Sequence, residues 1–347
     1  MANIQALTTD NMDLQNSNSK ESSRSPVVKP LLSIIVILHN MRREAPRTLY
    51  TMSDRFQQGV EADNWEVIVI ENGSGEPMRE EDVEQLGPQF HYIQYETHSV
   101  SPVTAINKGA RLARGRYLAV SIDGARLISP GVVRYTLAGL RAFPNAMVCT
   151  LAWHLGHKVQ NQALLEGYNQ AEEDQLLNSV DWRGDGYRLF DISCLADSSK
   201  SGFGEQISES NFFGLSATLF WQLGGFDERF MSPGGGLANL DFYKRVNETP
   251  GVELIHLLGE GTFHQFHGGV ATNVAPEDHP RDLYHSEYQA IRDVSYKPPI
   301  APITYVGTMP PASRKFFAMT RDDHRRVGIK PSRYAAFFQL LKQQFRS

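Results

Sequence analysis

The sequence predicts an α/β fold with a mostly parallel sheet flanked by helices. The runs Leu31–Leu38 and Glu66–Ile70 are apolar, rich in β-branched residues and free of alternation. Such runs are typical of strands buried on both faces, as in a parallel sheet. Segments with helix-compatible spacing separate successive runs, and polar residues follow each run. Because ligands bind beyond the carboxyl ends of the strands in such sheets, we expect the functional site there.

The predicted elements alternate between strand and helix along the chain. The first strand ends at His39 and Asn40, and a helix is expected at about Arg47–Gln58. The second strand stops in a polar, glycine-rich turn. Further strands are expected in 91–96, in 115–125 with its loop and in 146–156, and further helices in 102–113, 131–143 and 167–177.

Composition excludes several classes of protein. The net charge of -5 gives no electrostatic reason to expect a nucleic-acid partner. No apolar run approaches the roughly 20 residues that span a bilayer. The two cysteines, Cys149 and Cys194, belong to no paired motif, so we expect neither a disulfide framework nor a structural zinc site. These features favour a cytoplasmic location.

The two ends of the chain differ from its middle. Residues 1–30 are polar, lack the order of a signal peptide and are predicted to be a disordered lead-in. Residues 274–347 are expected to form a C-terminal extension, which is proline-rich and irregular after Asn273. Its last part, Pro331–Ser347, predicts an amphipathic basic helix. Such a helix either caps the domain or lies on the inner face of a membrane, and the negative net charge favours the cap.

Four stretches occur in an informative order: "LSIIVILHN", "WEVIVIENGS", "NKGARLARGRYLAVSIDGA" and "GGFDERF…GGGLANLDFYKR". This ordered set, over roughly Leu31–Gly269, resembles GT-A fold, family 2-like nucleotide-sugar glycosyltransferases. "GEGTFHQFHGG" is similar to the closing segment of a bacterial subgroup. The resemblance implies a GT-A domain at 31–273, with a nucleotide-sugar half at 31–150 and an acceptor half at 151–273. Within the second half, the polar stretch 156–205 is expected to be an insertion over the sheet edge that helps to bind the acceptor.

The resemblance also implies an activity. Such a hexosyltransferase moves a sugar from a UDP-, GDP- or dTDP-sugar donor to a hydroxyl of a glycan or another acceptor. The setting it implies is bacterial polysaccharide or glycoconjugate synthesis. The oligomeric state stays open.

The donor nucleotide is expected at the ends of the first two strands. The resemblance implies that His39 and Asn40 approach the nucleobase and ribose. Glu71 and Asn72 stand in the loop where family members carry an Asp that contacts uracil. The amide of Asn72 offers both a donor and an acceptor to a base edge. A simple Asn-Gly turn is the alternative, and the position at a strand end favours nucleotide contact.

Asp123 is expected at the donor diphosphate. Family members present Asp-X-Asp here, and the two carboxylates share a divalent metal, Mn²⁺ or Mg²⁺, that neutralises the leaving diphosphate. In this chain Asp123 and Gly124 are followed by Ala125, and Pro130 supports that register. The second carboxylate is therefore missing.

Two alternatives remain open for how the site manages without the second carboxylate. In the first, the metal stays and takes His264 and His267 as ligands together with Asp123. In the second, Arg126 neutralises the diphosphate without a metal. The alternative for the histidines is ordinary packing beside the glycines that follow them.

The acceptor side departs from the family in the same way. The family base position holds Asn239, which cannot accept a proton. We expect Asp241 to contact the acceptor or to act as the base, with Glu209 and Asp227 as alternatives. The loop Gly234–Gly236 would let the backbone approach the sugar.

Two rival functions are weighed against the enzyme. Because two family carboxylates are missing, the chain could be a catalytically silent GT-A domain that binds a sugar nucleotide or glycan, or scaffolds a complex. The second rival is a nucleotidyltransferase. That class usually needs a glycine-rich loop after the first strand, and "HNMRRE" has no glycine.

Overall fold

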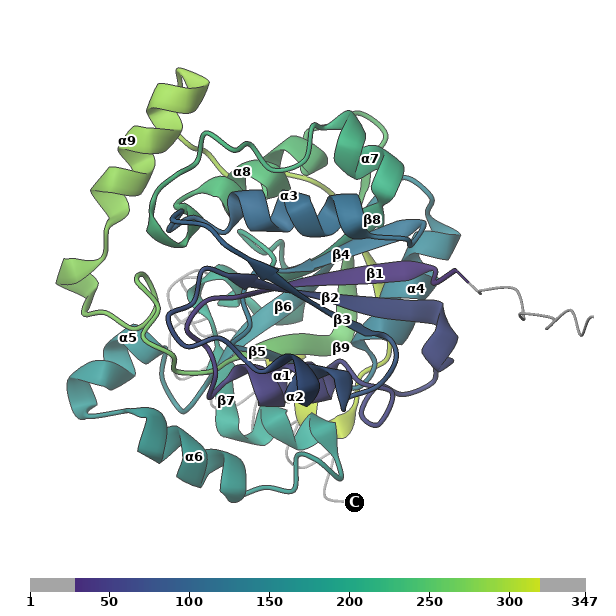
Figure 1. The fold of residues 1–347 in the computed structure, drawn as a ribbon, viewed down its shortest axis with the longest axis vertical. Coiled ribbons are helices and arrows are strands. Elements are labelled where there is room, and N and C mark those ends of the chain that lie inside the picture. The colour runs from purple at the N-terminus through teal and green to yellow at the C-terminus, as the bar shows by residue number, and fades with distance from the viewer. Residues whose placement is uncertain (1–28, 319–347) are drawn as a thin grey trace, which may run out of the picture.

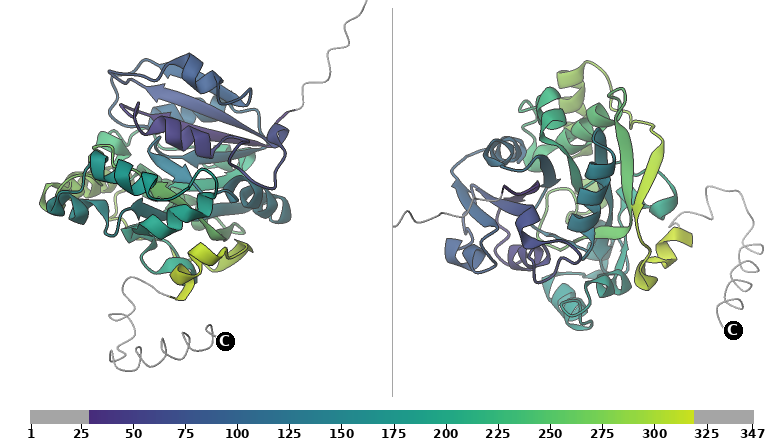
Figure 2. Two further views of the ribbon diagram at one scale, coloured as in Figure 1. Left: turned by 90° about the horizontal axis from the view of Figure 1, so that it is seen from below. Right: turned by 90° about the vertical axis from the view of Figure 1, so that its right-hand side faces the viewer.

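The computed structural model describes residues 29–318. Its centre is a ten-stranded mixed sheet, flanked by helices (Figure 1). Eight strands follow the order β10-β9-β6-β8-β4-β1-β2-β3, and β5 and β7 pair with β9 and β6 beside this path. The N-terminal strands and the last strand therefore lie at opposite edges (Figure 2).

Most pairs in the sheet are parallel, which confirms the predicted α/β class. The exception inside the eight-strand path is β8, which runs antiparallel between β4 and β6. The strands are β1 Leu32–Leu38, β2 Trp65–Asn72, β3 Phe90–Tyr95, β4 Tyr117–Ser121, β5 Arg126–Ile128, β6 Ala146–Leu155, β7 Ser193–Leu195, β8 Phe212–Ser216, β9 Glu253–His264 and β10 Ile303–Gly307.

Strand β1 shows why its residues form a central strand. All seven of its residues are buried. Because successive side chains point to opposite faces, Ile35 packs in one apolar core and Ile34 in the other. Helices α3 (Val103–Leu112), α7 (Ala217–Gln222) and α8 (Ala238–Asn247) cover the first face, while α1 (Ala45–Thr51) and α2 (Glu80–Glu84) cover the second (Figure 1).

The short strand β5 determines the geometry of the site. It follows the loop after β4 and pairs antiparallel with the end of β9, with Arg126 opposite His264. On its other side β9 runs parallel to β6, which places His154 beside His264. The register of the β6–β9 pairing shifts between Cys149 and Leu151.

The stretch 156–205 packs at the end of β6, where it contains several short elements. Strand β7 pairs antiparallel with β6. Helix α5 (Gln160–Ala163) leads into α6 (Gln170–Asn178), which confirms the helix expected in 167–177. The side chain of Asn169 caps α6 by accepting hydrogen bonds from the N–H groups of Ala171 and Glu172.

Two predictions of secondary structure were wrong. The helix expected at Arg47–Gln58 is α1, which starts earlier because Pro46 suits a first helical turn, and which ends at Thr51. The prediction that the chain is irregular after Asn273 misses α9 (Arg281–Arg292) and β10, which extends the sheet. The remaining helices are α4 Val132–Ala142 and α10 Lys315–Ala318.

The predicted lead-in, apart from residues 29–30, and the predicted helix at 331–347 lie outside the described residues. Among residues 29–318, no helix has both the length and the apolar character needed to cross a membrane.

Candidate active site

A cavity of about 720 Å³ opens at the carboxyl ends of β1, β2 and β4. It brings together most of the side chains that the sequence predicted for donor and acceptor. The predicted residues that line it are His39, Asn40, Asn72, Asp123, Arg126, Glu209, Gly234, Gly235, Gly236, Asn239, His264 and His267.

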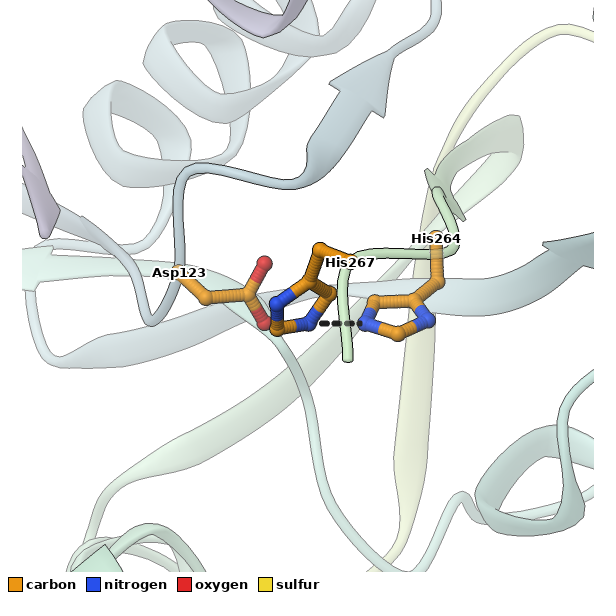
Figure 3. Close-up of side chains that lie close together, drawn as sticks. All are labelled: Asp123, His264 and His267. Carbon is orange, nitrogen blue, oxygen red and sulfur yellow. Dashed lines mark hydrogen bonds between the residues drawn. The ribbon is translucent and has the colours of Figure 1, made fainter. Parts of the chain in front are cut away.

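Three of these residues form a cluster of potential metal ligands. The ligand atoms of Asp123, His264 and His267 all lie within 4.8 Å of one another (Figure 3). The two imidazoles approach through their Nε2 atoms at 3.1 Å. Burial holds the pKa of His264 well below its ordinary value and also lowers the pKa of His267. Both rings are therefore neutral at pH 7, the form that binds metals, so the donor set fits a divalent cation.

Arg126 adds a positive charge next to this cluster. Its Nε donates a hydrogen bond of 2.7 Å to Oδ2 of Asp123. Arg126 lines the same cavity, and its Nη1 is buried and has no hydrogen-bond partner among the described residues. Since an unsatisfied buried donor is costly, this nitrogen is available to an anionic ligand.

The position of the missing carboxylate does not face the cavity. Ala125 is fully buried in the apolar core that also holds Leu38 and Ile128. Its N–H donates to Oδ1 of Asp123 at 3.0 Å, which holds that carboxylate in place. Gly124, which was expected at the donor, does not line the cavity. A Cβ there would lie 2.1 Å from Leu38, so glycine lets the loop pack closely.

At the nucleotide end, hydrogen bonds join the loops after β1 and β2. His39 Nδ1 donates to the carbonyl of Asn72 at 2.8 Å. Asn40 has a left-handed backbone (φ 53°), and its Oδ1 accepts from the N–H of Gly75 at 2.9 Å. Oδ1 of Asn72 is buried and has no partner among residues 29–318, so it can accept a hydrogen bond from a ligand.

Glu71, which was expected at the donor, does not line the cavity. Its carboxylate accepts hydrogen bonds from the hydroxyl of Ser74, from the N–H of Met78 at 3.0 Å and from the Tyr92 hydroxyl at 3.2 Å. Glu71 therefore stabilises the turn that carries Asn72.

On the acceptor side, Glu209 is the predicted base that reaches the cavity. The Nδ2 group of Asn239 donates to Oε2 of Glu209 at 3.0 Å and to the carbonyl of Ser210 at 3.1 Å. Asn239 therefore positions a carboxylate although it cannot act as a base itself.

Asp241 and Asp227, predicted to contact the acceptor or to act as the base, do not line the cavity. Asp241 is 1% exposed and is bonded by Arg245 at 2.8 Å and by Arg292 at 2.6 Å. Asp227 pairs with Arg229 and Arg292, and the bonds from Arg229 hold its pKa far below the ordinary value. With its pKa lowered in this way, Asp227 is a poor proton acceptor.

The sequence reasoning missed several residues of the cavity wall. Helix α9 packs on the glycine loop, whose three residues have positive φ, and the Tyr284 hydroxyl donates to the carbonyl of Pro233 at 2.8 Å. The apolar spacing of Tyr284, Tyr288 and Ile291 is a helical signal that could have revealed α9. The missed lining residues with polar side chains include His154, Asn161, Asp197, Asn211, His279, Arg281 and Tyr284.

Part of the chain matches known proteins. Residues 33–194 match the family model described as glycosyl transferase family 2. A validoxylamine A glucosyltransferase of Streptomyces hygroscopicus subsp. jinggangensis (strain 5008) is 28% identical over 230 residues, which are 64% of this chain and 53% of the relative. That of subsp. limoneus is also 28% identical, over 64% of this chain and 49% of the relative. The chain thus spans about half the length of these relatives.

Solved structures of S. aureus TarS are also similar. One has a TM-score of 0.48 at 14% identity and covers 75% of this chain and 38% of its own. TarS 1-349 in complex with UDP has a TM-score of 0.47 at 13% identity, over 88% of this chain and 77% of its own. The family match covers residues 33–194, and the sheet topology agrees with the fold class that the resemblance implies.

Proposed function

We propose that this protein transfers a hexose-type sugar from a nucleoside diphosphate donor to a hydroxyl acceptor, in the synthesis of a polysaccharide or glycoconjugate. The observation that carries the proposal is the convergence of Asp123, His264, His267 and the unpaired Nη1 of Arg126 in one cavity. This arrangement suits a diphosphate, because it combines a ligand set for a divalent cation with a buried guanidinium.

The donor lies with its nucleoside at the β1 and β2 ends. There the unpaired Oδ1 of Asn72 accepts a hydrogen bond from the base edge, and the loop of His39 and Asn40 flanks the ribose. Asp123, His264 and His267 would hold Mn²⁺ or Mg²⁺. When bound, such an ion neutralises charge on the leaving diphosphate. Arg126 donates from Nη1 to a diphosphate oxygen.

Glu209 is proposed as the base. It accepts the proton of the acceptor hydroxyl while the bond from that oxygen to the anomeric carbon forms and the bond from this carbon to the diphosphate breaks. The amide of Asn239 keeps Oε2 of Glu209 in place. The glycine loop Gly234–Gly236 and the start of α9 form the wall beside the acceptor.

Donor turnover tests the proposal. The protein is incubated with a panel of UDP-, GDP- and dTDP-sugars, with and without Mn²⁺, and released nucleoside diphosphate is measured. We expect release with one donor class and loss of release in Asp123→Asn. Asp82→Asn removes an exposed carboxylate outside the cavity and serves as the matched control. Donor binding without release or transfer for any sugar nucleotide would support the silent-domain alternative instead.

A further inference from the structure

We propose that Gln160 and Asn273 form a hydrogen-bond relay that fixes the ring tautomer of His264 and so presents its Nε2 to a divalent cation. This inference rests on the proposed function for the identity of the bound ion. The two amides touch neither the donor nor the ion in this scheme, so we regard them as positioning residues. Backbone N–H groups only donate and backbone carbonyls only accept, so their contacts fix the orientation of both amides.

The contacts of the Asn273 amide fix its orientation. Its Oδ1 lies 3.0 Å from each of three backbone nitrogens, those of His267, Gly268 and Gly269. A backbone N–H can only donate, so the amide oxygen of Asn273 must face this loop. Its Nδ2 group therefore points the other way, and it donates to Oε1 of Gln160 at 3.0 Å.

Gln160 is oriented at both ends of its amide. It is fully buried, and its Nε2 donates to the carbonyl of His264 at 2.9 Å. Because a carbonyl only accepts, this contact and the Asn273 contact require the same orientation of the Gln160 amide. Oε1 of Gln160 is then an acceptor that also lies 2.6 Å from Nδ1 of His264.

The tautomer of His264 follows. An amide oxygen opposite Nδ1 requires a hydrogen on Nδ1, and a neutral imidazole carries only one N–H. Nε2 therefore holds the lone pair, and it faces His267 and Asp123 in the cluster (Figure 3). A metal-bound histidine usually donates its other ring N–H to an oxygen in this way, which fixes the ring and raises its basicity.

The relay links two distant parts of the chain to the site. Gln160 is the first residue of α5, in the stretch predicted to be an insertion. Its backbone N–H donates to Nδ1 of His154 at 2.9 Å, which anchors it to the end of β6. Asn273 closes the loop that carries His267. The insertion thus has a role at the cation site in addition to any contact with the acceptor.

Two variants at one position separate the relay from simple packing. Gln160→Glu keeps an oxygen opposite His264 Nδ1 in either protonation state. Gln160→Met keeps the length of the side chain and removes the oxygen. The tautomer of His264 is read by NMR after ¹⁵N-histidine labelling, with the signal assigned by its loss in His264→Gln. Mn²⁺ binding, with and without UDP, is measured by calorimetry, and thermal melting reports folding.

We expect the Nδ1–H tautomer in the wild type and in Gln160→Glu, with Mn²⁺ bound at least as tightly by Gln160→Glu as by the wild type. Gln160→Met should lose this tautomer preference and bind Mn²⁺ roughly 10- to 100-fold more weakly. An Nε2–H tautomer in the metal-free wild type would overturn the relay without any variant. Equal weakening in both variants would contradict the relay, because it would show that the oxygen opposite His264 Nδ1 does not carry the effect.

The outcomes also separate this inference from the proposed function. The expected tautomers without Mn²⁺ binding in the wild type would support the relay and contradict the metal in the proposed function. Sugar transfer by a protein whose His264 carries its hydrogen on Nε2 would support the proposed function and contradict the relay.

Discussion

Arg126→Met tests the assignment of Arg126 to the donor diphosphate. Methionine keeps much of the apolar stem and removes the guanidinium, whose Nε bonds Asp123 and whose Nη1 is buried and unpaired. We expect the affinity for UDP to fall while the affinity for Mn²⁺ alone stays the same or rises. The second expectation follows because Oδ2 of Asp123 loses its guanidinium partner and becomes available to the cation.

The expected size follows from the single free donor. One hydrogen bond to a charged group contributes about 1.5–3 kcal/mol. Loss of the bond from Nη1 to the diphosphate should therefore weaken UDP binding by roughly 10- to 150-fold. Arg126→Lys keeps the charge without the planar fork and should lose less affinity.

The assay is calorimetric titration with UDP in the absence and in the presence of Mn²⁺, beside titration with Mn²⁺ alone. Melting curves of both variants control for folding, since Arg126 lies in β5 and pairs with β9. An unchanged UDP affinity in a folded Arg126→Met protein would refute the reasoning. A parallel loss of Mn²⁺ affinity would show instead that Arg126 mainly orients Asp123.

Two further predictions concern carboxylates. Glu209→Gln should lower the transfer rate by about 10²- to 10⁴-fold with donor affinity unchanged. Asp241→Asn should instead lower the free energy of unfolding by about 3–5 kcal/mol. Its transfer rate per folded molecule should stay nearly intact. Rates and urea unfolding distinguish the two, and a rate loss confined to Asp241→Asn would contradict the assignment. Burial raises the pKa of Glu260 from 4.5 to about 7, and hydroxyls of Ser129 and Tyr187 bond its carboxyl. Since the folded state binds this proton more tightly, the free energy of unfolding should fall as pH rises from about 4.5 to about 7; Glu260→Gln should flatten this dependence, and an equal pH dependence in both proteins would count against it.

The sequence predicted the sheet and the edge of the sheet that carries the site. Buried strands such as Leu32–Leu38 are recognisable in the sequence as short runs of mostly apolar residues. Polar residues at strand ends, such as Asn72 and Asp123, reach the cavity because the carboxyl ends of parallel strands share one edge. The metal-ligand hypothesis also named His264 and His267, which the structure brings close to Asp123.

Which carboxylate faces the cavity could not be predicted from sequence order. Asp241 lies on α8, and its carboxylate accepts hydrogen bonds from Arg245 and Arg292. No local sequence pattern indicates that Arg292, which lies on α9, is its partner. Gln160 was missed for a similar reason. Its partner His264 is distant in sequence, and a glutamine in a polar insertion carries no periodic signal.

The pairing of β5 with β9 has a consequence for thermodynamic measurements. Arg126 and His264 are opposite each other through backbone hydrogen bonds, although they are far apart in the sequence. The anion site and the cation site therefore exist together only when the folded sheet is complete, and the unfolded chain offers neither. By linkage, a ligand bound there stabilises the whole domain by RT ln(1 + [L]/Kd), about 2.7 kcal/mol at a concentration of 100 Kd. A shift in melting temperature is thus a general binding assay for this protein, and it requires no knowledge of the acceptor.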